Sequence, residues 1–210
     1  MSESGSAATE AATEAMAAPE DAERALAEAR ATGDPRTIGG AESYLGASYV
    51  AHGRRADALA ALQASEQTFA AAGLQREAAI SRINVARCLS ESGRGAEALE
   101  LYEGVAAARE STDRDIAVEA WNGLVEHHQQ AGELSRATVL IQDSVRRLEA
   151  EGRWAVAADA LMIEGAAHHR AGELHQAVDC FTRAVAAYDA AGEGQWAANA
   201  RHNLGVVKGP

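Results

Sequence analysis

A glycine that returns about every 40 residues constrains the fold of this chain more than any other feature. The main series of glycines is spaced by 40, 39 and 40 residues, and an alanine follows each glycine five positions later. These glycines are Gly53, Gly93, Gly132 and Gly172. A second series lies midway between them, at Gly33, Gly73, Asp113, Gly152 and Gly192. Such spacing is typical of repeated supersecondary units that each stack on their neighbours.

The apolar residues between these glycines follow the period of an α-helix. In residues 96–106 they fall at i, i+1, i+4, i+7 and i+8, which is one helical face, at Ala98, Leu99, Tyr102, Val105 and Ala106. A glycine directly after a helical run is the usual left-handed C-cap. Aromatic residues make up 4% of the chain and only three prolines occur, a composition that favours helices over sheets. The sequence therefore predicts an all-α fold with two helices in each repeat.

The spacing also sets the expected domain organisation. Residues 1–17 contain no large apolar side chain except Met16, which predicts a disordered tail rich in Ala, Ser and Glu. A repeat domain then covers 18–210, beginning with half a repeat at 18–33. Full repeats follow at about 34–73, 74–113, 114–152 and 153–192, and a closing helix covers 193–207. The pair Gly39-Gly40 predicts that the first helix of repeat one begins late, near Ala41.

The residues at equivalent positions resemble those of the tetratricopeptide repeat. Repeat one supplies Leu45, Gly46, Tyr49, Gly53 and Ala58, and repeat four supplies Leu161, Gly165, His168, Gly172, Ala177 and Phe181. The repeats are longer than the minimal unit of about 34 residues, and they lack its junction proline. They are similar to the 40-residue repeats of kinesin light chains, spindle-orientation adaptors and bacterial peptide-sensing regulators. The resemblance implies a right-handed superhelical solenoid of antiparallel helix pairs.

The resemblance further implies that the first helix of each repeat lines a concave groove. The implied groove residues are Tyr44, Asn84, Arg87, Asn122, Glu126, Gln129, Met162, His169, Arg170, His202 and Asn203. An amide side chain can donate to and accept from a peptide backbone at once, and arginine can pair with a carboxylate. The set favours a protein or peptide partner, although each residue taken alone is equally consistent with a hydrated surface.

Charge and motif content argue against several other functions. The formal net charge is −12, which disfavours nucleic acid and anionic membranes as partners. Neither a signal peptide nor an apolar run long enough to span a membrane is present, so we expect a cytoplasmic protein. No phosphate-binding glycine motif occurs, and Cys88 and Cys180 lack metal-type spacing and are interpreted as packing residues. We therefore expect no cofactor.

Clustered histidines leave an enzymatic or metal-dependent role as an alternative. They are His127, His128, His168, His169 and His202. His128 and His168 take the position of the family's interior tyrosine, which favours hydrogen-bonded rings packed between helices. We identify no HExxH or other two-ligand spacing on one helix face, and so predict neither a metal site nor catalytic residues.

The leading hypothesis is a non-catalytic adaptor that binds a peptide or helix of a partner protein. A regulatory sensor of a small peptide or metabolite is a second alternative. Self-association into a homodimer through the exposed ends of the stack also stays open. Trp121 is expected in the core, and packing at the repeat junctions is the favoured role of Trp154 and Trp196.

Overall fold

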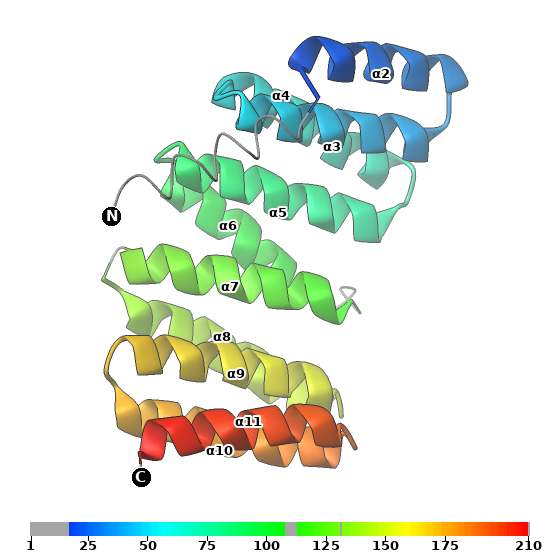
Figure 1. Cartoon of the computed structure of the whole chain (residues 1–210). Helices are drawn as coiled ribbons and strands as arrows, with labels where there is room; N and C mark the ends of the chain where they lie inside the picture. The colour runs from blue at the N-terminus through cyan, green and yellow to red at the C-terminus, as the bar shows by residue number, and fades with distance from the viewer. Residues whose placement is uncertain (1–16, 108–112, 131, 210) are drawn as a thin grey trace. The chain divides into compact units, whose positions relative to one another are not determined.

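A computed structural model describes residues 17–107, 113–130 and 132–209, and within these ranges every regular element is an α-helix (Figure 1). This confirms the all-α prediction. The tail predicted for residues 1–17 lies almost wholly outside the described residues. The chain divides into two compact units, one up to residue 101 and one from residue 102 onward. The handedness of a superhelix therefore stays a prediction.

Unit 1 is a stack of antiparallel helices. It contains α2 (Pro19–Thr32), α3 (Pro35–Ala51), α4 (Arg55–Ala71), α5 (Gln75–Glu91) and the first part of α6 (Gly95–Ala107). Helix α2 packs on α3, and α4 packs on both α3 and α5. Two helices joined by a three-residue turn thus recur as the building unit.

Unit 2 continues the same pattern. It contains the remainder of α6, then α7 (Arg114–Gln130), α8 (Leu134–Ala150), α9 (Trp154–Arg170), α10 (Leu174–Ala190) and α11 (Gly194–Lys208). Helix α9 packs on α7, α8 and α10, and α10 also packs on α11. Helix α9, the first helix of its repeat, therefore lies against α8 before it and α10 after it. It also lies against α7, the first helix of the preceding repeat.

The glycines that define the repeat end the helices as expected. Both glycine series have positive φ, with values of 66° to 78° from Gly33 to Gly192. At seven turns of the described chain, the residue after the glycine donates its backbone N–H to the carbonyl five residues back, at 2.8–2.9 Å. Arg54 bonds to Tyr49 in this way, and Glu173 bonds to His168. This is the six-to-one hydrogen bond of the Schellman motif.

Small residues on first helices accept large residues from second helices. A Cβ placed at Gly46 of α3 would lie 2.6 Å from Leu62 Cγ of α4, and one at Gly165 of α9 would lie 2.8 Å from Phe181 Cε1 of α10. Leu62 and Phe181 are both buried. Glycine at these positions allows the two helix backbones to approach closely enough to bury the large side chain.

The late start predicted for the first helix of repeat one is wrong. Helix α3 begins at Pro35, and Asp34 caps it by accepting a hydrogen bond from the Thr37 backbone N–H at 2.8 Å. Gly39 lies inside the helix, where a Cβ would fall 2.7 Å from the Phe69 ring of α4. The glycine therefore permits a close helix contact, and the cap and packing outweigh its low helix propensity.

Candidate functional site

A cleft in unit 1 lies between the first helices of two successive repeats. Its volume is about 190 Å³, and its walls come from α3 and α5 with one residue of α4. It is lined by Ser43, Ala47, Val50, Leu62, Asn84, Arg87, Cys88 and Glu91. Asn84 and Arg87, for which the family resemblance implies a place in a concave groove, are thus both part of this cleft.

The lining follows from helical geometry on both sides. Ser43, Ala47 and Val50 lie three or four residues apart on α3, so they share one face. Asn84, Arg87 and Glu91 of α5 do the same on the opposite wall.

The cleft is apolar in its depth and polar at its edge. Leu62 and Cys88 are buried, whereas Val50 is 38% exposed and Arg87 and Glu91 lie at the surface. The Cys88 thiol donates to the Arg55 carbonyl at 3.6 Å, and burial, with a smaller effect of the Glu91 charge, raises its pKa. Cys88 is therefore a packing residue of the floor, as expected from the sequence.

A second, wider recess of about 420 Å³ lies between α2, α3 and α4. Its polar groups are already engaged within the protein. Thr68 donates to the Glu42 carboxylate at 2.7 Å, and the Tyr49 hydroxyl donates to Glu23 at 2.6 Å, which raises the pKa of Tyr49. None of the eleven predicted groove residues lines this recess.

The other predicted groove residues lie in unit 2, apart from Tyr44, which is 42% exposed on α3. Asn122, Glu126, His169, Arg170 and His202 are exposed, and Gln129 and Asn203 are half-buried. The Gln129 amide donates to the Ala167 carbonyl at 3.4 Å and accepts from Arg170 at 3.2 Å, so groove residues of α7 and α9 meet. Met162 instead packs against the cluster that Ala177, Phe181 and Val207 form.

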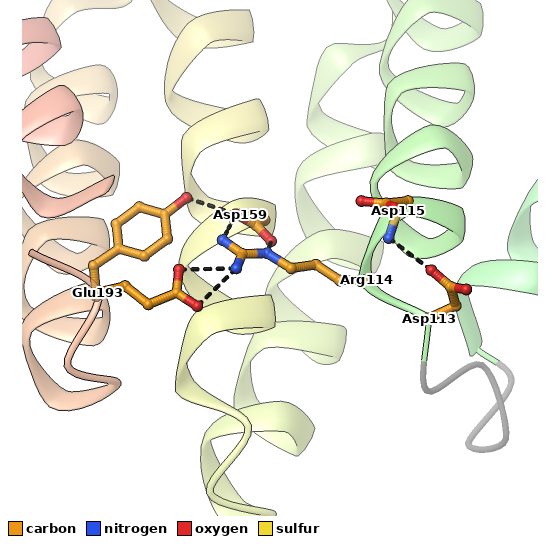
Figure 2. A network of polar contacts seen from close by, with 6 residues as sticks. Asp113, Arg114, Asp115, Asp159 and Glu193 are labelled. Atoms are coloured by element: carbon orange, nitrogen blue, oxygen red, sulfur yellow. Dashed lines mark hydrogen bonds and ion pairs between the residues drawn. The ribbon is translucent and has the colours of Figure 1, made fainter. Parts of the chain in front are cut away.

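A polar network joins the starts of three helices in unit 2 (Figure 2). Arg114, the first residue of α7, donates through Nη2 to Asp159 of α9 at 2.8 Å and through Nη1 to both oxygens of Glu193, just before α11, at 2.8 Å. The Tyr188 hydroxyl donates to Asp159 at 2.6 Å, and burial, with this bond, raises the pKa of Tyr188. The network fixes the spacing of three first helices and was not predicted from the sequence.

The aromatic residues differ in environment. Trp121 is buried, as expected, whereas Trp154 and Trp196 are 38% and 50% exposed. Trp196 stacks on Tyr188 with ring centroids 6.3 Å apart, and the Arg114 guanidinium lies 5.3 Å from the Trp196 ring centroid. Trp196 thus belongs to a packed junction, although half of its surface is exposed.

Among the described residues, the histidines do not combine into one potential metal-binding group. His169 and His202 are exposed, and His127 contacts the ring of His128 at a centroid distance of 5.6 Å. His128 is 2% exposed, and neither of its ring nitrogens has a hydrogen-bond partner among the described residues. The expectation of a hydrogen-bonded interior ring is therefore wrong for His128. It holds for His168, whose Nδ1 lies 2.5 Å from Glu173.

One buried group brings three potential metal ligands together. Glu164 and His168 lie four residues apart on α9, and Cys180 lies on α10; one ligand atom of each is within 4.8 Å of the others. The expectation that no helix face carries two ligands at metal spacing is therefore wrong. A signal was present, because Glu164 takes the register position that Leu45, Val85 and Leu124 fill in the other repeats.

Together these helix pairs define a helical-repeat protein. No family model matches the sequence, and no curated protein matches it. Among solved structures, the crystal structure of BtubC (BKLC) from P. vanneervenii is similar, with a TM-score of 0.57 and 17% sequence identity over 93% of this chain and 91% of that chain. This likeness concerns the fold alone. No helix in the described ranges is long and apolar enough to cross a membrane.

Proposed function

We propose that this chain is a tetratricopeptide-repeat protein of the long-repeat variety, and that it is a non-catalytic adaptor holding a peptide or helix of a partner protein in the α3–α5 cleft. One observation carries the proposal. Asn84 and Arg87, for which the family resemblance implies a place in the groove, line a cleft that the packing of unit 1 forms.

The chemistry of the cleft suits a peptide. Val50 and Leu62 offer an apolar surface for a side chain, and the Asn84 amide can donate to and accept from an extended backbone. Arg87 and Glu91 place opposite charges at the edge of the cleft. There they contribute more to the orientation of a bound peptide than to its affinity.

The size of the cleft favours a peptide anchor over a metabolite site. Small-molecule pockets usually enclose about 300–1,000 Å³, which exceeds the 190 Å³ of this cleft. At this cleft the adaptor hypothesis is thus preferred to the sensor alternative. We also propose a reducing, cytoplasmic setting, supported by two buried free cysteines, Cys88 and Cys180.

Selection of short peptides from a random displayed library tests the proposal. The expected outcome is a family of related sequences whose affinity falls by at least about tenfold in the double variant Asn84→Ala, Arg87→Ala, the effect of about 1.4 kcal/mol of lost contacts. The control is Gln63→Ala with Gln67→Ala, two exposed positions on α4 outside the cleft. Circular dichroism establishes equal helicity. If the two double variants bind the selected peptides with equal affinity, the cleft is not the binding site.

A further inference from the structure

We propose that Glu164, His168 and Cys180 form a binding site for a divalent transition metal ion, with Zn²⁺ the best fit. The site lies within unit 2 and is independent of the cleft in unit 1. Carboxylate oxygen, imidazole nitrogen and thiolate sulfur are the three ligand types that Zn²⁺ takes in proteins.

The distances already approach those of a coordinated ion. Zn²⁺ bonds of about 2.0–2.3 Å place neighbouring tetrahedral ligand atoms roughly 3.3–3.8 Å apart. Glu164 Oε1 lies 3.7 Å from His168 Nε2, and all three ligand atoms lie within 4.8 Å of one another.

Outer contacts orient two of the ligands. His168 Nδ1 lies 2.5 Å from the Glu173 carboxylate, which favours a proton on Nδ1. Nε2 is then the acceptor nitrogen, and it lies 3.4 Å from the Thr138 hydroxyl and 3.7 Å from Glu164 Oε1. The Gln142 amide donates to Glu164 Oε2, so Oε1 stays directed toward His168. A carboxylate behind a ligating histidine is the usual support of zinc sites.

Electrostatics also favour a cation at this position. Glu164 and Cys180 are 2% and 3% exposed. Burial raises the pKa of both groups, and the charge of Glu164 raises that of Cys180 further. A divalent ion offsets the charges of one carboxylate and one thiolate, and its binding releases the thiol proton to solvent.

The preceding repeat provides an internal comparison. Forty residues earlier, His128 and Glu133 stand where repeat four has His168 and Glu173. The positions of Glu164 and Cys180 are filled there by Leu124 and Leu140, however. Repeat four thus has two ionisable groups, Glu164 and Cys180, where repeat three has two leucines. Both groups lie close to His168.

Titration of the chelator-treated full chain with Co²⁺ tests the site. We expect one equivalent to give a thiolate-to-cobalt absorption band with the intense visible bands of four-coordinate cobalt. The thiolate band disappears in Cys180→Ser and stays in Cys88→Ser, the matched change at the buried cysteine of unit 1. No thiolate band in the wild type, or an equal band in Cys180→Ser, would overturn the proposal.

A second measurement covers the case in which Cys180→Ser folds poorly. Glu173 is partly exposed, so Glu173→Gln leaves the fold intact while removing the support of His168. We expect Zn²⁺ affinity to fall by about 10- to 100-fold, whereas Glu133→Gln, the equivalent change in repeat three, has no effect. Equal Zn²⁺ affinity for the two variants, or no rise of the wild-type Tm with Zn²⁺, identifies the cluster as a hydrogen-bonded core instead.

Discussion

The guanidinium of Arg114, at the first residue of α7, donates to the Asp159 carboxylate on α9 at 2.8 Å. Asp159 is 8% exposed and also accepts the Tyr188 hydroxyl, so the carboxylate lies in the interior of unit 2, whereas the Arg114 side chain is 28% exposed. Buried carboxylates require such partners because desolvation penalises their charge. The pair therefore anchors the start of α7 to the next first helix.

Removing the arginine leaves this carboxylate without its cation. We expect Arg114→Met to lower the unfolding free energy of unit 2 by about 2–3 kcal/mol, the scale of a charged hydrogen bond lost in the interior. Urea denaturation followed by circular dichroism measures the change.

Arg201→Met is the matched control for that change. Arg201 also bonds to both oxygens of a carboxylate, Asp189, but the two side chains are about half exposed. The expected loss is at most about 1 kcal/mol, because solvent screens an exposed pair. Equal losses in the two variants would mean that the Arg114 network contributes nothing beyond a surface ion pair.

His128 should make unit 2 sensitive to acid. Burial lowers its pKa, and the neighbouring His127 and Arg136 lower it further, against the opposing charges of Glu133 and Glu103. The unfolded chain then binds the proton more readily than the folded chain. Stability is fully present above the ordinary histidine pKa of about 6.5 and is lost as the pH falls below it.

Replacing His128 with phenylalanine removes this acid sensitivity. We expect His128→Phe to be more stable than the wild type in mildly acidic buffer, with a smaller difference at neutral pH, because no unpaired ring nitrogens stay buried. Thermal unfolding at the two pH values measures the effect. The account of His128 fails if acid lowers the Tm of both proteins equally.

Two adjacent glycines of α3 should respond to alanine with opposite signs. At Gly39 a Cβ would press on the buried Phe69 ring, so Gly39→Ala is expected to destabilise unit 1 by about 1–3 kcal/mol. At Gly40 no atom of the described residues lies within 4 Å of an added Cβ. Gly40→Ala is therefore expected to stabilise unit 1 by about 0.5–1 kcal/mol. Chemical denaturation of the two variants gives the comparison, and two changes of the same sign would contradict it.

The same glycine pair shows which features of the fold could be predicted from the sequence and which could not. The periodic glycines predicted the helix ends correctly, because a left-handed C-cap is a local requirement. The interpretation of Gly39 as a helix breaker is wrong, since this glycine serves a contact with Phe69, a residue of the next helix. Local propensity carries no information on such a contact.

The candidate sites also include features that the sequence predicted and features that it could not predict. The family resemblance implied groove positions for Asn84 and Arg87, and the two residues share a wall of the cleft because they lie three apart on α5. The register could not show that α10 brings Cys180 to Glu164, nor that Arg114 reaches Asp159 across 45 residues. Both depend on side-chain directions between helices, which spacing alone does not determine.

The most direct test of the adaptor account is site-specific photocrosslinking to a selected peptide. A photoreactive residue replaces Ala47, an exposed residue on the α3 wall of the cleft, or Ala70, an exposed residue of α4 that does not line it. The account predicts a crosslinked product from position 47 that excess unlabelled peptide abolishes, and none from position 70. Crosslinking from position 70 with none from position 47 would contradict binding in the cleft.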